Sequence, residues 1–246
     1  MTAPLRPLPA YLAVVAAVVF GAGSLLLLVV FLLAGPFGWI DLGLGSAEVL
    51  AWSILLCLTF SVQHSGMVRR SFRRRLARAA GPRYHGALYA IVSGLVLLAV
   101  LVLWQESEIV VVQLHGPARL LTRVLFASAI AGFAWAAWVL PGFDLLGIEP
   151  VLKGLRGRPV RPPRFLVRGP YRWVRHPMYT LTLMLLWSYP DLTADRLLLN
   201  LLWTIWIGVG SILEERDLVD EFGDAYRRYR STVPMLLPWR RPYVCN

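Results

Sequence analysis

Long apolar runs, separated by short polar segments, make up most of the chain. A helix needs about 20 mostly apolar residues to cross a bilayer core of about 30 Å. The pattern therefore predicts an all-α, polytopic membrane bundle with five to six transmembrane helices. The expected apolar helices are Tyr11–Ala34, Ala47–Gln63, Gly86–Trp104, Leu120–Leu140, the shorter Pro177–Tyr189, and Leu197–Leu213.

The composition supports a membrane location. Of the 246 residues, 57% are hydrophobic and only 16% are charged, and the mean hydropathy is +0.60. Such a chain is too apolar for a water-soluble domain of this length. Its two cysteines, Cys57 and Cys245, have neither the spacing of a metal site nor that of a disulfide framework. No metal is expected.

The net charge of +11 is concentrated in two loops. The loop between the second and third spans carries Arg69, Arg70, Arg73, Arg74, Arg75, Arg78 and Arg83. The loop between the fourth and fifth carries Lys153, Arg156, Arg158, Arg161, Arg164, Arg168, Arg172 and Arg175. Intervening loops carry acids such as Asp41, Glu106 and Asp191. By the positive-inside rule, both basic loops and both termini are expected in the cytoplasm, as in a bacterial inner (plasma) membrane protein.

This distribution accounts for the positive charge without a nucleic-acid partner, and none is expected. Arg69, Arg70, Arg73 and Arg74 recur at helical spacing, which indicates an interfacial helix on anionic lipid headgroups. Membrane lipids are therefore expected partners, whereas the sequence leaves the oligomeric state open.

The chain is expected to divide into two functional parts. Residues 1–142 would form an N-terminal transmembrane scaffold. Residues 143–246 would form a catalytic half with a cytoplasmic loop rich in glycine and proline, an apolar hairpin and an amphipathic C-terminal helix. On that helix Leu218, Phe222, Tyr226 and Tyr229 share one face.

Two local hydrogen-bonding features are also expected at helix surfaces. Thr193 or Asp191 is placed to cap the last span, and Asp224 is placed to pair with Arg228 at i,i+4.

Polar residues gather at both edges of the apolar hairpin. Arg175 and His176 precede its first helix, and Glu214 and Glu215 follow its second, so all four are expected at one membrane level. A guanidinium, an imidazole, phenols and two acids would suit S-adenosylmethionine, which carries a carboxylate and a sulfonium cation. The alternative is a structural ion pair between Arg175 and one of the two acids.

An ordered motif adds a family resemblance. It comprises Gly169–Tyr179 (GPYRWVRHPMY), Glu214–Leu218 (EERDL), Phe222–Gly223, Tyr226, Tyr229 and Val233–Pro234. This pattern resembles the isoprenylcysteine carboxyl methyltransferase and phospholipid methyltransferase superfamily of integral membrane enzymes. Weaker similarities, at Gln63–Arg69, Phe143–Gly147 and Trp187–Thr193, point to the bacterial branch that includes methanethiol S-methyltransferase.

The resemblance implies an S-adenosylmethionine-dependent methyltransferase with a cytoplasmic cofactor pocket. Its implied cofactor-binding residues are Leu166, Val167, Gly169, Tyr171, Arg175, His176, Tyr179, Glu214 and Glu215. Among them, Arg175, His176 and Glu214 are the catalytic candidates. A sulfonium methyl is already activated, so catalysis would rest on positioning and water exclusion, which can supply about 7–11 kcal/mol.

Four residues are candidates for the substrate side: Gln63, His64, Leu181 and Trp187. Gln63 and His64 either line a pocket or mark a helix end among headgroups. Leu181 departs from the family, where many members have glycine two positions after the motif tyrosine. A larger side chain there would narrow a substrate tunnel or reflect different helix packing.

Of the possible methyl acceptors, a small thiol is preferred. It must react as the thiolate, and a nearby cation such as Arg175 or His176 could lower the pKa of the thiol. His64 and His176 are weaker candidates for the proton acceptor. A lipid or isoprenylcysteine carboxylate, which needs no base, is the alternative acceptor. Membrane sterol reductases share a related C-terminal half and use a nicotinamide cofactor, but their larger set of spans is missing here. A non-enzymatic scaffold with lipid-binding arginine loops also remains as an alternative.

Overall fold

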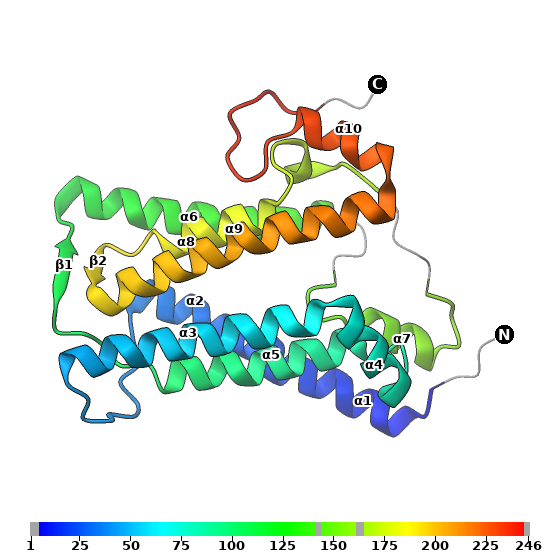
Figure 1. Ribbon diagram of the computed structural model, residues 1–246, viewed down its shortest axis with the longest axis horizontal. Helices are drawn as coiled ribbons and strands as arrows, with labels where there is room; N and C mark the ends of the chain where they lie inside the picture. The colour runs from blue at the N-terminus through cyan, green and yellow to red at the C-terminus, as the bar shows by residue number, and fades with distance from the viewer. Residues whose placement is uncertain (1–4, 141–143, 161–164, 244–246) are drawn as a thin grey trace. The chain divides into compact units, whose positions relative to one another are not determined.

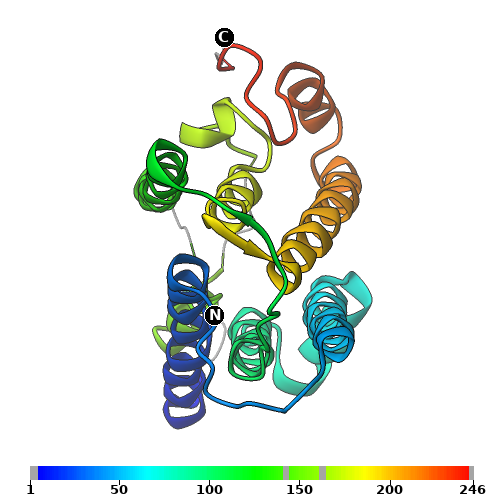
Figure 2. The same cartoon turned by 90° about the vertical axis from the view of Figure 1, so that its left-hand side faces the viewer.

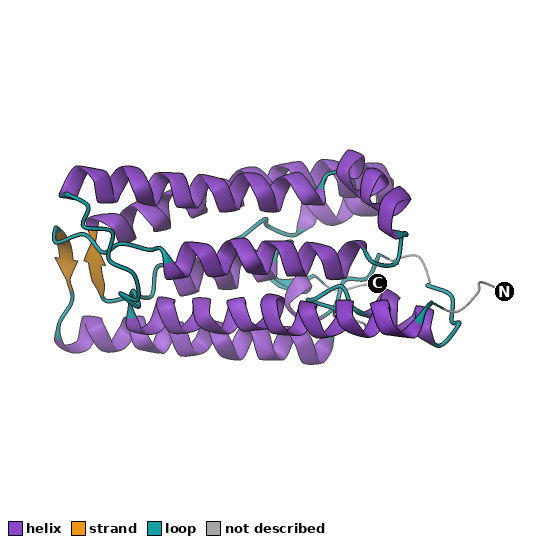
Figure 3. Cartoon of the chain, turned by 90° about the horizontal axis from the view of Figure 1, so that it is seen from below, coloured by secondary structure: helices purple, strands orange, loops and turns teal. Residues whose placement is uncertain are grey.

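The computed structural model describes residues 5–140, 144–160 and 165–243, and the secondary structure of this part is mainly helical, with two short strands (Figures 1 and 3). Four residues named above lie outside the described residues: Phe143, Arg161, Arg164 and Cys245. Within the described part, five helices are long and apolar enough to cross a membrane: Pro7–Ala34, Ser46–Val68, His85–Val102, Gly116–Val139 and Ala194–Phe222. The predicted all-α membrane bundle is confirmed.

The helices form two compact units. Unit 1 lies within residues 1–108 and 144–162, and unit 2 lies within residues 109–143 and 163–246. The sequence predicts a division by role, into a scaffold (1–142) and a catalytic half (143–246). The compact units do not test roles, so that division stays a prediction.

Unit 1 is organised around the helix α5. Its elements are α1 (Pro7–Ala16), the π-helical turn η1 (Ala17–Ala22), α2 (Gly23–Ala34), α3 (Ser46–Val68), α4 (Arg70–Ala80), α5 (His85–Val102) and α7 (Glu149–Leu155). Within this unit, α5 lies between the continuous α1–η1–α2 helix and α3 (Figure 2). The helix predicted after the second span is confirmed, because Arg70, Arg73 and Arg74 lie in α4 and Arg69 directly precedes it, whereas its contact with lipid headgroups stays a prediction.

A glycine allows α5 to approach the first span closely. A Cβ atom added to Gly94 would overlap the backbone carbonyl of Phe20 in η1. The neighbouring Ser24 hydroxyl donates to the carbonyl oxygen of Gly21 at 2.9 Å. Membrane helices associate through such small-residue contacts, because lipid offers no hydrophobic driving force between helices.

Unit 2 contains the apolar hairpin and the tail. Its elements are β1 (Val110–Gln113), α6 (Gly116–Val139), the 3-10 turn η2 (Gly169–Arg172), α8 (Pro177–Leu186), β2 (Asp191–Thr193), α9 (Ala194–Phe222) and α10 (Asp224–Thr232). Within this unit, α8 lies between α6 and α9 (Figure 2). A ten-residue helix such as α8 is only about 15 Å long, half the thickness of a bilayer core.

Two short strands, which the sequence did not predict, join the hairpin turn to the segment before α6. β1 and β2 pair antiparallel, with Val110 opposite Thr193 and Gln113 opposite Asp191. Asp191 also accepts a hydrogen bond from Arg119 at 2.8 Å. Thr193 directly precedes α9, as expected, but the predicted capping hydrogen bond is not formed by its side chain, and the Asp191 carboxylate is engaged by Arg119 instead.

The C-terminal helices differ from the prediction in their boundaries. α9 continues without a break from the apolar segment to Phe222, and it ends at Gly223, which has a positive φ of 58°. On α10 the predicted Asp224–Arg228 pair is wrong: Asp224 binds Arg227 at 2.7 Å, since i,i+3 residues share a helix face as i,i+4 residues do. The predicted apolar face is confirmed, because Tyr226 and Tyr229 are buried together with Val233, with Leu218 and Phe222 packed against them.

We expect Gly94→Ala to destabilise the protein by about 1–3 kcal/mol, because the added methyl group forces α5 away from the first span. Thermal unfolding of the detergent-purified protein measures the effect. Gly208→Ala is the matched control: Gly208 also lies in a predicted membrane helix, and a Cβ there meets nothing within 4 Å. Equal unfolding temperatures for the two variants would contradict a close helix contact at Gly94.

Candidate active site

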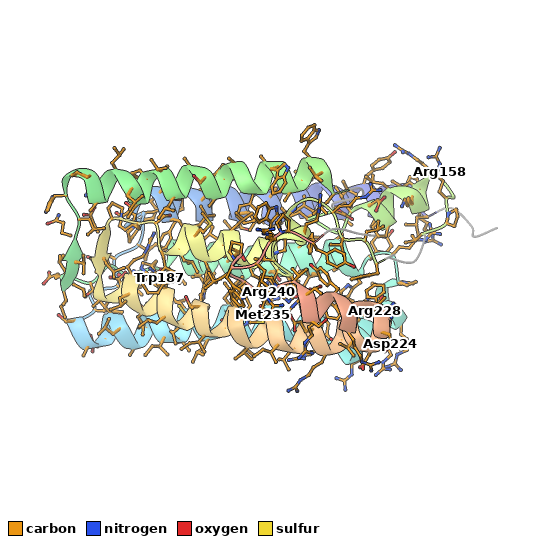
Figure 4. The ribbon with its side chains drawn as sticks, turned by 90° about the horizontal axis from the view of Figure 1, so that it is seen from above. Arg158, Trp187, Asp224, Arg228, Met235 and Arg240 are labelled. Atoms are coloured by element: carbon orange, nitrogen blue, oxygen red, sulfur yellow. The ribbon has the colours of Figure 1, made fainter. Side chains whose placement is uncertain are left out.

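The tail after α10 lies along the start of α8. The backbone N–H groups of Arg175 and His176 donate to the carbonyl oxygens of Pro234 and Met235, at 2.9 and 3.1 Å. One helical turn later, the Thr180 hydroxyl donates to the Leu236 carbonyl at 2.7 Å. Met235 and Arg240 mark this tail in Figure 4. These bonds hold the tail against the Arg-His-Pro segment that opens the hairpin.

Arg175 binds the end of α9 and the tail at the same time. Its Nε donates to Oε1 of Glu215 at 2.6 Å, and its Nη1 donates to the carbonyl oxygens of Arg230, at 2.8 Å, and Val233. Arg230 adds a second contact to Glu215, with 3.4 Å between Nε and Oε2. The structure thus forms the ion pair that the sequence left as an alternative, and these partners differ from the ligand carboxylate first suggested for Arg175.

His176 is buried between the two glutamates. Its Nε2 lies 3.3 Å from Oε1 of Glu215, and its ring stacks on Tyr179 with 5.3 Å between centroids. Burial lowers the pKa of His176 below its ordinary value of 6.5, although the charges of Glu214 and Glu215 act in the opposite direction. The imidazole is therefore neutral at pH 7.

The two adjacent glutamates have different surroundings. The side chain of Glu215 is 5% exposed, whereas that of Glu214 is 45% exposed. Glu214 accepts a hydrogen bond from the Tyr179 hydroxyl at 2.8 Å. Burial raises the pKa of Tyr171, and the charge of Glu214 raises it further, so this phenol lies in the field of the same carboxylate. An accessible acid beside aromatic rings is suited to a cationic ligand.

The segment before η2 packs beside this site. Val167 contacts the buried aromatic cluster of α10, while Leu166 is half exposed. Gly169 has a positive φ of 52°, and a Cβ there would lie 2.8 Å from a methyl group of Val139 on α6. The Tyr229 hydroxyl donates to the carbonyl oxygen of Tyr171 at 2.6 Å, which fixes η2 to α10.

Two substrate-side candidates of unit 2 lie on other parts of α8. Leu181 packs on α6, where a Cβ added to Gly132 would lie 2.5 Å from its side chain. Both residues line an apolar groove of about 360 Å³, together with Trp135 and Trp173. Trp187, labelled in Figure 4, directly follows α8, at the opposite end of that helix from His176, and its Nε1 donates to the Thr204 hydroxyl at 3.0 Å.

Gln63 and His64 belong to unit 1, where both contact α5. The amide of Gln63 donates to the Ser93 hydroxyl at 3.2 Å and lies 3.0 Å from the sulfur of Met67. His64 forms a hydrogen bond with the Tyr89 hydroxyl. Their side chains are thus engaged with protein groups inside the unit.

The structure adds two residues to this region that were not among the predicted site residues, although Tyr226 belongs to the motif described above. Arg230 contacts Glu215, and Tyr226 is buried within the electrostatic reach of both glutamates. Sequence spacing placed Tyr226 on an apolar helix face, and nothing in that pattern distinguishes a packing tyrosine from one near a charged site. In the described ranges, no group of three or more His, Cys, Asp and Glu residues is arranged to hold a metal ion.

The profile of the NnrU protein family matches residues 53–228. This chain belongs to that family. Methanethiol S-methyltransferase 1 of Bradyrhizobium diazoefficiens is 36% identical, over 80% of this chain and 69% of its own length. The methanethiol S-methyltransferases of Pseudomonas deceptionensis and Mycobacterium tuberculosis are 37% and 34% identical, over 81% and 80% of this chain and 77% and 80% of their own lengths.

These relatives confirm the resemblance described above and the prediction of a membrane methyltransferase. No solved structure matches the chain.

We expect His176→Gln to reduce the loss of stability in acid. As the pH falls below 6.5, the unfolded chain takes up a proton at His176 that the folded protein does not, so unfolding becomes more favourable, by at most about 1.4 kcal/mol per pH unit. The variant lacks this proton uptake. Unfolding temperatures at pH 7.5 and 5.5 test this, and an equal pH dependence in both proteins would show that His176 is not held neutral.

Proposed function

We propose that this protein transfers a methyl group from S-adenosylmethionine to a small thiol at the site formed by Tyr171, His176, Tyr179 and Glu214. The observation that carries the proposal is the accessible Glu214 carboxylate, which lies beside the stacked rings of His176 and Tyr179. The names of the relatives, which are methanethiol S-methyltransferases, support the choice of a thiol.

The chemistry of these side chains fits the proposed donor. Glu214 would attract the cationic groups of the donor and accept hydrogen bonds from its hydroxyls, and the phenol rings would face the sulfonium. When bound, this cofactor supplies a methyl group that is already activated for transfer. The chain must then hold the thiol, exclude water and take up the thiol proton.

His176 is the proposed proton acceptor. Because Glu215 faces Nε2, the neutral ring is expected to carry its proton there and to leave the lone pair of Nδ1 available. Nδ1 lies 3.7 Å from Oε2 of Glu214, which is the more exposed of the two acids. A base oriented by a buried carboxylate is a common arrangement for activating a nucleophile. The thiol would give its proton to Nδ1, and its sulfur would form the new bond to the methyl carbon as the bond from that carbon to the sulfonium sulfur breaks, with S-adenosylhomocysteine as the leaving group.

A second candidate acceptor is an amphiphilic carboxylate, such as a lipid or an isoprenylcysteine. The apolar groove at Leu181 and Gly132, with its two tryptophans, favours this candidate because it suits a hydrocarbon chain. A carboxylate acceptor would not require His176 as a base, so His176→Gln would spare its methylation.

We expect Glu214→Gln to weaken the binding of S-adenosylhomocysteine at least tenfold, since it removes the accessible negative charge. Calorimetry on the detergent-purified protein measures the affinity, and methyl transfer to methanethiol and to a prenylcysteine identifies the acceptor. Glu221→Gln is the matched control, because Glu221 is exposed two turns further along α9. Arg175 is less suitable for substitution, because its loss would also detach the tail. Undetectable binding by the folded wild-type protein would refute the proposed donor.

We also propose that both termini and the candidate site face the cytoplasm of a bacterial inner membrane, since the arginine-rich loops support this orientation. A fluorescent protein fused after Asn246 should therefore fluoresce, and alkaline phosphatase fused there should be inactive. Fusions after Glu108, in an acidic loop, should behave in the opposite way. An active phosphatase at the C-terminus would reverse the topology.

A further inference from the structure

Tyr226 places a buried hydroxyl group within the aromatic cluster of α10. The residue is 2% exposed, and its phenol oxygen has no hydrogen-bond partner among the described residues. Buried polar groups in native proteins are nearly always paired, and an unpaired one often marks a missing water, ion or ligand. Tyr229, one turn along α10, shows the usual arrangement, because its hydroxyl donates to the Tyr171 carbonyl.

The ring of Tyr226 is held in place by its aromatic neighbours. It meets Phe165 edge to face, with 5.9 Å between centroids, and Tyr229 with 5.8 Å between centroids. Val233 and Phe222 belong to the same cluster. Because the cluster is packed on several sides, the hydroxyl cannot reach a partner by a simple rotation of the side chain.

The charges that act on this hydroxyl come from the candidate active site. They are those of Glu215 and Glu214 on α9, Arg175 before α8 and Arg230 on α10. Burial raises the pKa of Tyr226, and the Glu215 charge raises it further, so the hydroxyl keeps its proton. The nearby acids already have donors: Arg175 and Arg230 for Glu215, and Tyr179 for Glu214.

We propose that Tyr226 is a ligand-binding residue whose hydroxyl donates a hydrogen bond to an acceptor atom of the bound methyl donor. This inference rests on the proposed function and adds a residue to its site. The protein without ligand then holds a destabilising, unpaired hydroxyl in place, and the ligand gains a donor that is already oriented and desolvated.

The substitution Tyr226→Phe tests this with two measurements that change in opposite directions. Without ligand, removing the unpaired hydroxyl should leave the thermal unfolding temperature unchanged or raise it. The affinity for S-adenosylhomocysteine, measured by calorimetry on the full-length protein in detergent, should fall roughly tenfold, the loss typical of one hydrogen bond.

Tyr229→Phe is the comparison for a structural tyrosine, because it removes a hydrogen bond within the protein and should lower the unfolding temperature. If the wild-type protein binds S-adenosylhomocysteine and Tyr226→Phe binds it equally tightly, the proposal is overturned. It is also overturned if Tyr226→Phe lowers both the unfolding temperature and the affinity, because a structural role would account for both losses. If the wild-type protein itself does not bind, the proposed function fails, and this inference fails with it.

Discussion

The buried carboxylate of Glu215 determines the arrangement of the candidate active site. A carboxylate at 5% exposure is costly to leave uncompensated, so donors have to surround it. Arg175 contacts Oε1 and Arg230 contacts Oε2, from different segments of the chain, and His176 lies against Oε1. Since Arg175 also donates to two carbonyl groups near the end of α10, the acid in α9 fixes both the start of α8 and the tail.

This arrangement separates the roles of two neighbouring acids. Successive residues of a helix point about 100° apart, so an inward-facing Glu215 turns Glu214 towards the accessible side. Glu215 is engaged in ion pairs, whereas Glu214 keeps an accessible oxygen beside aromatic rings. A pair of identical residues can therefore supply both the framework and the ligand-facing charge, provided that the helix continues through them, as α9 does.

The membrane helices were predictable from the sequence because bilayer thickness imposes a minimum apolar length. Their ends were less predictable, since hydropathy records where lipid ends and not where a helix ends. α9 therefore runs nine residues beyond the predicted Leu213, to Phe222. The strands β1 and β2 were missed because four and three residues carry too little pattern, and their pairing joins segments far apart in the sequence.

The residue types of the candidate site were also visible in the sequence, but their partners were not. The motif placed Arg175 and Glu215 together, yet two partners of Arg175 are carbonyl groups at the end of α10, and backbone atoms leave no signature in residue identity. The same limit applies to Tyr226: the sequence places it in the motif and on an apolar helix face, but neither reveals which atoms surround its hydroxyl. Its unpaired hydroxyl becomes evident once the surrounding side chains are placed and each buried polar atom is checked for a partner. In this chain, residue patterns identify the charged framework, and the unpaired Tyr226 hydroxyl in the described part of the chain is the basis for the ligand contact that we propose.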